Sequence, residues 1–216
     1  MLGKARRPVI FSRAMSTLSR LDKRELILAK GSQAMTRCGY HGTGVQEIVQ
    51  AAGIPKGSFY HYFASKEDFA LQALDYLYAP RLRRYAEALG NPALNPRARI
   101  LGYYRDLLAH FSQKQSLEYH CFIGSLSFEM AELSPGITAQ VDAILRESID
   151  ILHGTLRQAQ ALGELSADED CANLAEFIGN AWQGVLARLK VAGSGPARAL
   201  QPMEAFIARL ERLLQS

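Results

Sequence analysis

The stretch of sequence that decides the fold is residues 43–66, TGVQEIVQAAGIPKGSFYHYFASK. Its first half predicts a short helix, because Val45, Ile48 and Val49 are three and four residues apart and share one helix face. Gly53 follows that face and can adopt the positive φ with which many helices end. The pattern therefore predicts a helix that stops at a tight turn.

Helix signals stand on both sides of this turn. Thr43 is expected to cap the first helix, and Gln46 stands three residues later, where a capping-box partner belongs. Pro55 fits the first turn of a second helix, where its missing N–H is not needed. Phe59 and Phe63 are four residues apart and are expected to face inward together. Two short helices joined in this way form a helix-turn-helix, whose second helix enters the major groove of DNA.

The outward face of the second helix distinguishes a DNA-binding unit from a plain helical hairpin. When the two phenylalanines face inward, the residues left on the surface are Lys56, Gly57, Ser58, Tyr60 and His61. A hairpin with a buried aromatic cluster needs no such combination of a cation, a glycine, a hydroxyl group and two polar aromatic rings. We therefore predict that this face contacts DNA.

The segment GVQEIVQAAGIPKGSFYHYFASKEDF resembles the DNA-binding signature of TetR-family transcriptional repressors, and the resemblance extends over residues 23–74. It implies an all-α protein with an N-terminal three-helix helix-turn-helix head and a C-terminal helical bundle for ligand binding and dimerisation. It also implies a homodimer on double-stranded operator DNA that contains an inverted repeat. The residues expected at the DNA backbone are Thr43, Gly57 and Lys66, and those expected nearest the base edges are Lys56, Ser58, Tyr60 and His61. Gly44 is also expected to bind DNA.

The composition also favours a helical protein with a basic N-terminal part. Hydrophobic residues make up 48% of the 216 residues, which excludes a disordered chain. Aromatic residues make up 9%, and long β-branched runs are absent, so helices are favoured over sheet. Residues 1–66 hold 11 lysines and arginines against 3 acidic residues, a balance of +8, whereas residues 67–216 balance at −4. A basic segment that coincides with the helix-turn-helix fits attraction to DNA phosphates.

The cysteines and the apolar runs indicate the cellular compartment in which the protein is expected to act. Cys38, Cys121 and Cys171 are an odd number at wide spacing, which argues against a disulfide framework and for a reducing compartment, the cytoplasm. The cysteines and the five histidines lack the spacing of a metal site, and we expect neither a metal nor a cofactor. No apolar run is long enough to span a bilayer, and the run at residues 9–11 is too short for a signal peptide.

Turn signals divide the chain into three parts. Residues 1–19 are predicted to be a basic arm, residues 20–66 the helix-turn-helix domain, and residues 67–216 the ligand-binding and dimerisation domain. Translation starts either at Met1 or at Met15, and the sequence leaves both open.

Further helices are predicted from apolar residues at helical spacing and from start and stop signals. The predicted features are a first helix over residues 22–37, a capping box at Ser65, helices over 97–114, 116–133 and 137–163, a capping box of Ser166 and Glu169, and a loop over 192–202 before the last helix. The last two helices have wide apolar faces, and those of two subunits are expected to pair in a four-helix bundle.

Three classes of function fit an all-α chain of this kind. The first is a ligand-controlled DNA-binding repressor. The second is an enzyme with Cys121 as nucleophile and His120 as base, but neighbours on a helix point about 100° apart, so His120 cannot easily serve Cys121. The third is an adaptor for protein partners, which does not explain the basic N-terminal part. Hydrolase, metalloprotease and nucleotide-binding motifs are absent from the sequence, and we predict that the protein is not an enzyme.

The segment ILGYYRDLLAHFSQKQSLEYHCFIGSLSFEMAELSPGI resembles the branch of the TetR family that contains NemR and AcuR. Cys121 and Lys190 match the cysteine and the lysine of that branch, whereas His120 and Phe122 replace its usual glycine and leucine. The resemblance implies a response to reactive electrophiles, hypochlorite-type oxidants or acrylate-like compounds. We expect Cys121 to be the sensor, with its thiolate favoured by a helix N-terminus and by Lys190. The alternative is a buried structural cysteine and a non-covalent apolar inducer.

An apolar cavity inside each subunit's bundle is the expected effector site. Its candidate lining residues are Tyr103, Tyr104, Phe111, Phe122, Phe128, Phe177 and Trp182. For each of these residues taken singly, ordinary core packing is the alternative.

Overall fold

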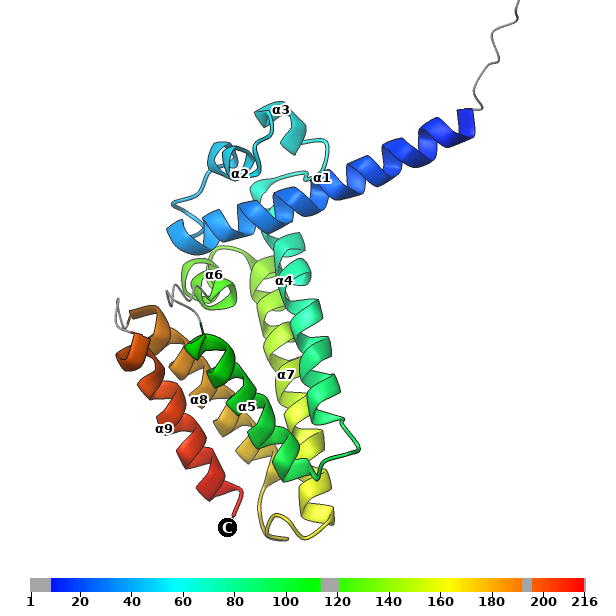
Figure 1. Cartoon of the computed structure of the whole chain (residues 1–216). Helices are drawn as coiled ribbons and strands as arrows, with labels where there is room; N and C mark the ends of the chain where they lie inside the picture. Colours follow the sequence, from blue (N-terminus) through cyan, green and yellow to red (C-terminus); the bar gives the residue numbers. More distant parts are fainter. Residues whose placement is uncertain (1–8, 114–120, 192–195, 216) are drawn as a thin grey trace, which may run out of the picture. The chain divides into compact units, whose positions relative to one another are not determined.

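The structure is a computed structural model that describes residues 9–113, 121–191 and 196–215, with side chains from residue 23 on except those of 190–191 and 196–199. These described residues form α-helices and no strand, so the predicted all-α fold is confirmed (Figure 1). The helices are α1 (Val9–Cys38), α2 (Val45–Ala52), α3 (Lys56–Phe59), α4 (Lys66–Leu89), α5 (Pro96–Ser112), α6 (Phe122–Met130), α7 (Pro135–Ala161), α8 (Cys171–Val191) and α9 (Pro196–Leu213). Within the described part of the chain, no helix is both long and apolar enough to cross a membrane.

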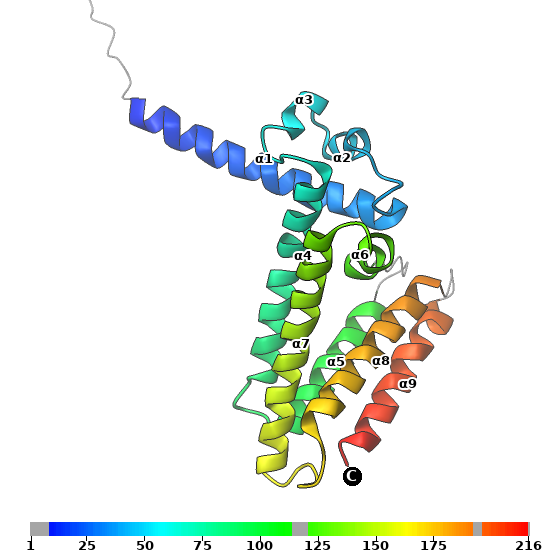
Figure 2. The same ribbon diagram turned by 180° about the vertical axis from the view of Figure 1, so that it is seen from behind.

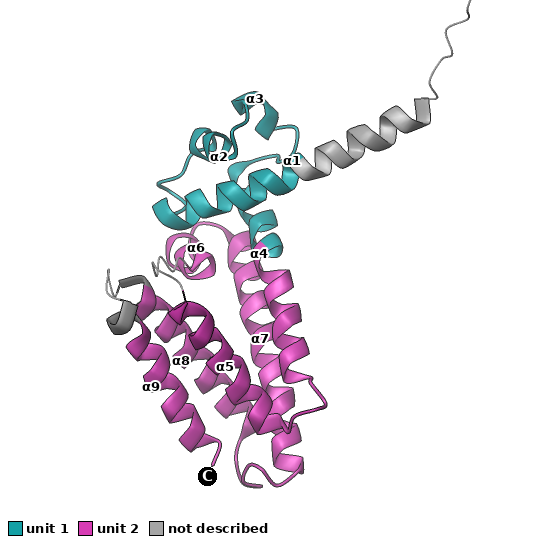
Figure 3. Ribbon diagram, in the orientation of Figure 1, with its two compact units in different colours: residues 1–76 teal, residues 77–216 magenta. Residues whose placement is uncertain are grey.

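Two compact units make up the chain, and we call them the head (Met1–Tyr76) and the C-terminal unit (Leu77–Ser216) (Figure 3). The division falls inside α4, so this helix contributes residues to both units. We had predicted the boundary at residue 66, where α4 begins.

The head is built around a small apolar core to which α1, α2, α3 and the start of α4 contribute. Ile27 of α1 and Ile48 of α2 are fully buried where these two helices pack together. Gly53 ends α2 with φ at 66°, which confirms the predicted positive-φ stop. The turn that follows leads through Pro55, the N-cap of α3. The predicted helix-turn-helix is therefore present in the head.

The start of α2 differs from the prediction. Gly44 is the N-cap residue, and its N–H donates to the carboxylate of Glu47 at 2.9 Å. The hydroxyl of Thr43 donates instead to the carbonyl of Gly39 at 2.8 Å. The predicted pair of Thr43 and Gln46 is wrong by one residue, because the Thr43 hydroxyl is taken by the preceding turn.

Three other helix starts also differ from the prediction. Helix α1 begins at Val9 rather than near residue 22, since neither proline nor glycine interrupts residues 9–30. The carboxylate of Asp170, rather than Ser166, accepts hydrogen bonds from the first N–H groups of α8 at 3.0 and 3.1 Å. Helix α9 begins at Pro196, inside the predicted loop over 192–202, because proline is well suited to a first turn.

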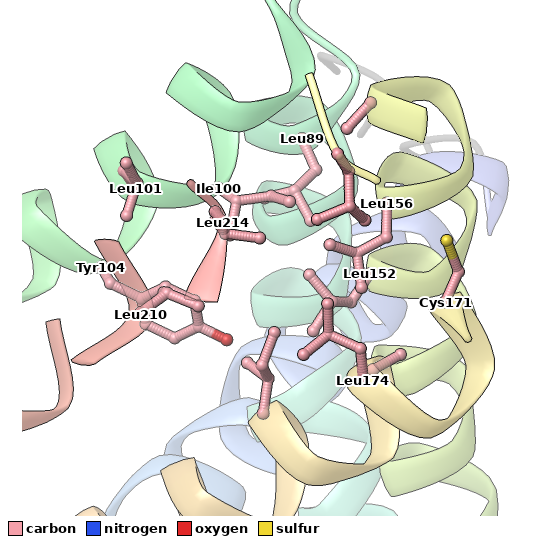
Figure 4. Close-up of a cluster of buried hydrophobic side chains, with 14 of the residues drawn as sticks. Leu89, Ile100, Leu101, Tyr104, Leu152, Leu156, Cys171, Leu174, Leu210 and Leu214 are labelled. Carbon is pink, nitrogen blue, oxygen red and sulfur yellow. The ribbon is translucent and has the colours of Figure 1, made fainter. Parts of the chain in front are cut away.

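The C-terminal unit is a helical bundle with a large hydrophobic core cluster. Helix α9 packs against α5 and α8, and α7 contacts α5, α6 and α8 (Figure 1 and Figure 2). The core takes side chains from the end of α4 and from α5, α7, α8 and α9, among them Leu89, Ile100, Leu152, Leu174 and Leu210 (Figure 4). Ser134 begins α7 by accepting from the N–H of Ile137 at 3.1 Å, directly after the predicted stop of the preceding helix.

Candidate DNA-binding surface and effector site

Helix α3 is fixed to the head through one side only. Phe59 and Phe63 are 0% and 1% exposed, as predicted, and their ring centroids lie 5.9 and 5.2 Å from that of Phe69. This aromatic cluster holds the short helix although α3 has only four residues. Packing through the inner rings leaves the opposite side of α3 open.

The open side carries the residues that we predicted to meet DNA. Lys56, Gly57, Tyr60 and His61 are exposed, and Ser58 is half-buried. Tyr60 is 59% exposed, with its ring edge against Phe59. A cation, hydroxyl groups and an imidazole therefore share one solvent-facing surface, and these are groups that bind phosphates and base edges. We call residues 56–61, apart from Phe59, the α3 face.

Gly57 is not required by the fold of the head. A Cβ atom built on Gly57 would have no heavy atom within 4 Å, and its φ is not positive. Glycine inside a helix costs about 0.5–1 kcal/mol relative to alanine. The fold of the head would therefore accept a side chain at position 57, on the exposed side of α3.

The other predicted backbone contacts are less open. Thr43 is 1% exposed, so its side chain is buried in the head rather than presented to a partner. The Lys66 ammonium donates to the carbonyl of Tyr40 at 3.0 Å and lies 4.1 Å from the centroid of the Tyr40 ring. Burial, with a smaller effect from the Glu67 carboxylate, raises the pKa of Tyr40. Thr43 and Lys66 therefore stabilise the turn that precedes α2, and Gly44 is half-buried beside them.

The predicted sensor Cys121 lies at the start of α6. It is the N-cap residue of α6 rather than a residue of the predicted helix over 116–133, and residues 116–120 of that prediction lie outside the described residues. Cys121 is 5% exposed, and its sulfur accepts a hydrogen bond from the N–H of Gly124 at 3.3 Å. A Cβ atom on Gly124 would lie 3.3 Å from this sulfur, so the glycine leaves room for the contact. Phe122, also a predicted site residue, is 2% exposed beside it.

Tyr78 of α4 is a part of this site that the sequence patterns did not indicate. Its hydroxyl oxygen accepts a hydrogen bond from the N–H of Ile123 at 3.0 Å, in the first turn of α6. Burial raises the pKa of Tyr78, and the neighbouring Cys121 raises it further, whereas the positive charge of Arg81 acts in the opposite direction. No local pattern in the sequence links Tyr78 to residue 121.

Two of the other predicted effector residues, Tyr104 and Trp182, belong to a core cluster that does not include Cys121. Tyr104 is 3% exposed in the core, with ring centroids 5.0 Å from those of Trp182 and Phe206. Phe177 is 53% exposed, so its assignment to an interior cavity is wrong. Because α8 is apolar on more than one side, periodicity did not show which of its apolar residues face inward. The side chain of Lys190 and the whole of His120 lie outside the described residues.

Phe177 lines a groove between α8 and α9 instead. The groove has a volume of about 310 Å³ and is lined by Phe177, Ala181, Val185, Phe206, Arg209 and Leu213, among others. Arg209 is the charged residue in an otherwise apolar lining. An apolar surface of this kind on the last two helices fits contact with another helical surface.

Two stretches of the chain match known families of domains. Residues 27–73, which hold the helix-turn-helix, match the bacterial regulatory proteins of the tetR family. Residues 96–203 match the tetracyclin repressor-like C-terminal domain. The chain belongs to the TetR family of transcriptional regulators. The predicted family is confirmed, and Cys121 falls within the matched C-terminal domain.

Individual TetR-family proteins resemble the chain over most of its length. The HTH-type transcriptional repressor NemR of Escherichia coli is 32% identical over 193 residues, which cover 89% of this chain and 94% of NemR. The transcriptional regulator AcuR of Cereibacter sphaeroides is 34% identical over 165 residues, which cover 76% of this chain and 75% of AcuR. The crystal structure of reduced E. coli NemR covers 89% of this chain and 97% of its own, with a TM-score of 0.77.

Membership of the TetR family favours the first of the three classes of function set out above, the DNA-binding regulator. These relatives are transcriptional regulators, in agreement with a DNA-binding head. Among the residues that the structure describes, no group of three or more histidine, cysteine or acidic side chains could hold a metal ion.

Proposed function

We propose that this TetR-family protein is a transcriptional repressor that binds an inverted-repeat operator as a homodimer and is released by a small reactive effector at Cys121. Residues 20–66 bind DNA, with residues 1–19 as a basic arm, and residues 67–216 bind the effector and the second subunit. The protein acts in the cytoplasm and is not an enzyme. The similarity to NemR, which is named a repressor, supports repression.

The α3 face carries the proposal for DNA. It combines Lys56, Tyr60 and His61 on the surface with Gly57, a glycine that nothing inside the head requires. Each subunit places one α3 in the major groove of a half-site, with Gly57 closest to a phosphate. Gly44 lies at the N-cap of α2, where backbone N–H groups favour an anion. The basic balance of residues 1–66 supplies the attraction that does not depend on sequence.

Binding to a fluorescent duplex from the DNA upstream of the protein's own gene tests this face. We expect Tyr60→Ala to weaken binding by roughly 1–3 kcal/mol. Tyr76→Ala is the matched control, because Tyr76 is 37% exposed in the same unit but does not lie on the α3 face. Unchanged operator binding by the double variant Tyr60→Ala, His61→Ala would remove the α3 face from the interface.

Gly57→Ala separates DNA binding from folding. With no atom near the added methyl group, the variant should be as stable as the native protein or more stable. Its affinity for the operator should fall, because the methyl group stands between the backbone and the DNA phosphate. Native affinity in a stable Gly57→Ala protein would show that DNA does not approach this position.

The groove between α8 and α9 supports the homodimer. Phe177 is an exposed aromatic side chain on a largely apolar lining, and a second copy of this surface would cover it. Phe177→Asp should convert the dimer into monomers and lower operator affinity, and analytical ultracentrifugation measures the change. Ala161→Asp, an exposed substitution at the end of α7, provides the control. A dimer that persists in Phe177→Asp would place the subunit contact elsewhere.

Cys121 carries the proposal for the effector. Its sulfur lies at the N-terminus of α6, where it accepts a hydrogen bond from the Gly124 N–H. An activated alkene would accept the sulfur's electron pair at its β-carbon and a proton from water at its α-carbon. Hypochlorous acid would instead transfer its oxygen to the sulfur and form a sulfenic acid, with chloride as the leaving group. The relative NemR has been crystallised in a reduced form, which supports a sensor cysteine whose sulfur has more than one oxidation state.

DNA release by N-ethylmaleimide or hypochlorite tests the sensor. The native protein should release the operator, and Cys121→Ser should retain it. Cys38→Ser, which removes the exposed cysteine of the head, should behave as the native protein does. If Cys121→Ser releases DNA as readily as the native protein, Cys121 is not the sensor.

One observation favours a second candidate, a non-covalent inducer. Cys121 is only 5% exposed, so a reagent reaches its sulfur less easily than it would reach a cysteine on the surface. An apolar acid that binds inside the bundle could shift the population away from the DNA-binding state without reacting. Release of DNA by such an acid from Cys121→Ser, with no change in protein mass, would select this candidate.

A further inference from the structure

Hydrogen bonds in the head connect α1 to the chain directly after α3. The guanidinium group of Arg24 in α1 donates to the side-chain oxygen of Gln72 in α4, with Nε at 3.0 Å and Nη2 as a second donor. The Gln72 Nε2 atom donates to Oδ1 of Asp68 at 2.8 Å. The backbone N–H of Ala64 donates to the other oxygen of this carboxylate, Oδ2, also at 2.8 Å. We call the side chains of Arg24, Gln72 and Asp68 the polar link.

The amide group of Gln72 is oriented by the charges on its two sides. Its oxygen faces the Arg24 guanidinium, which has only donors, and its nitrogen faces the Asp68 carboxylate, which has only acceptors. Hydrogen bonds to a charged group are roughly twice as strong as those between neutral groups. All three side chains are half-buried, so water competes less for these bonds than it does at an open surface. The polar link is therefore a directional connection between α1 and α4.

The bond to Ala64 lies where the chain leaves the α3 face. Ala64 directly follows Phe63, which is buried in the aromatic cluster, and comes three residues after His61. The cluster holds α3 by apolar contacts, and the hydrophobic effect is not directional. Hydrogen bonds weaken steeply when their angle changes, so they do fix a direction. The cluster thus keeps α3 against the head, and the polar link fixes the backbone at the end of the α3 face.

Helix capping accounts for only part of this arrangement. The hydroxyl oxygen of Ser65 accepts from the Asp68 N–H at 3.0 Å, which is one half of the capping box predicted at Ser65. The Asp68 carboxylate supplies the other half one residue earlier than usual, at the N–H of Ala64. Such a cap is complete within residues 64–68. The bonds of Gln72 to Asp68 and to Arg24 go beyond it and tie the cap to α1.

We propose that Gln72 is a positioning residue for DNA recognition, which together with Arg24 and Asp68 holds the α3 face in the orientation that base contacts require. The inference rests on the proposed role of the α3 face. Contacts to base edges depend on the exact placement of each donor and acceptor, whereas attraction to phosphates depends mainly on charge. Loss of the polar link should therefore weaken binding to the operator and leave binding to unrelated DNA unchanged.

The ratio of the affinities for the operator and for a scrambled duplex of the same composition tests the proposal. Gln72→Met removes the amide group but keeps the side-chain length, the net charge and a good helix former. It should lower the ratio about tenfold, the discrimination that one base contact provides. A residue that only stabilised the head would change the fraction of active protein, and so both affinities equally. Gln33→Met, at an exposed glutamine of α1 outside the polar link, is the matched control.

A second variant shows whether Arg24 acts through Gln72. Arg24→Met removes a positive charge, so its affinity for both duplexes should fall, but its ratio should fall only as far as in Gln72→Met. In the double variant Arg24→Met, Gln72→Met, the ratio should equal that of Gln72→Met alone, because the link is already broken. Losses that multiply in the double variant would show two independent effects and overturn the polar link.

Hydrogen exchange tests the link without DNA. The Ala64 amide is held by Asp68, and the other oxygen of that carboxylate is held by Gln72. In Gln72→Met the Ala64 amide should exchange about tenfold faster, because the carboxylate is no longer fixed. The amide of Ile48, which donates to the Gly44 carbonyl at 3.2 Å in α2, should keep its native rate. An unchanged rate at Ala64 overturns the link.

Tyr60→Ala, measured on the same two duplexes, separates this inference from the proposed role of the α3 face. A native ratio in Gln72→Met beside a lowered ratio in Tyr60→Ala overturns the positioning role of Gln72 and leaves the α3 face in the interface. Native ratios in both variants overturn both proposals. A lowered ratio in both variants, with native binding to the scrambled duplex in Gln72→Met, is the expected result.

Discussion

The head and the C-terminal unit place their aromatic residues in opposite ways. In the head, Phe59, Phe63 and Phe69 form a buried cluster without polar atoms, and the polar ring of Tyr60 faces solvent. In the C-terminal unit, buried rings carry hydroxyl groups, and burial raises the pKa values of both Tyr85 and Tyr104. The head therefore keeps its interaction chemistry outside, where a large partner such as DNA can reach it. The C-terminal unit keeps phenols and a thiol inside, where a small molecule can be selected.

The largest expected effect compares a buried and an exposed phenylalanine. Phe59→Ala should destabilise the protein by about 3–5 kcal/mol, because the ring is 0% exposed at the centre of the head's core. Phe128→Ala in α6 should change stability by less than about 0.5 kcal/mol, since that ring is 89% exposed. Urea unfolding measures both. A loss of more than about 2 kcal/mol in Phe128→Ala would show that the ring is covered in the assembled protein.

The second expected effect concerns Gly31 in α1. A Cβ atom there would lie 2.6 Å from the Ile48 Cγ2 atom and 2.8 Å from the Phe69 Cζ atom. Gly31→Ala should therefore overpack the head and cost about 1–3 kcal/mol. Gly102→Ala in α5 is the control, because its added methyl group meets no atom within 4 Å. Operator affinity should fall in the first variant while the alkylation rate of Cys121 stays the same, and a change in that rate would show that the effect of overpacking is not confined to the head.

The third expected effect is a loss of stability at alkaline pH that arises mainly in the C-terminal unit. Burial raises the pKa values of Tyr78, Tyr85, Tyr103 and Tyr104 above the ordinary value of 10.0. A raised folded-state pKa gives stability that is complete below pH 10 and is lost as the pH rises, because the unfolded chain ionises first. Each such tyrosine contributes up to about 1.4 kcal/mol per pH unit above 10.

Circular dichroism between pH 7 and pH 11.5 checks this third prediction. The stability of Tyr85→Phe should fall less steeply with rising pH than the stability of the native protein. Tyr60→Phe should follow the native curve, because Tyr60 is exposed in the head. Equal slopes for the native protein and Tyr85→Phe would mean that Tyr85 is not protected from ionisation.

The smallest expected effect is at Gly124. An added methyl group would lie 3.3 Å from the Cys121 sulfur, so the sulfur must move by a few tenths of an ångström. Gly124→Ala should change stability by less than about 1 kcal/mol but should slow alkylation of Cys121. Gly154→Ala in α7 is the matched control, because its methyl group would meet nothing within 4 Å. Alkylation at the native rate in Gly124→Ala would show that the sulfur reacts from another position.

The sequence by itself determined the fold class and the orientation of α3, because these depend on short-range patterns. The inward pair of Phe59 and Phe63 follows from a spacing of four residues, and the stop at Gly53 follows from the φ that glycine permits. Local patterns were less exact about helix ends. Candidate caps compete over neighbouring positions, and Gly44 and Asp170 took the places that we had assigned to Thr43 and Ser166.

Only the tertiary structure decided which side chains surround Cys121. Tyr78 and Ile123 are 45 residues apart, and their hydrogen bond depends on how α4 and α6 approach each other. Phe177 and Ile178 are neighbours on an apolar helix, yet the first is 53% exposed and the second 1%. Helical periodicity identifies a residue as apolar but does not choose between two apolar faces. That choice is made by packing between helices, because burial depends on neighbours that are distant in the sequence.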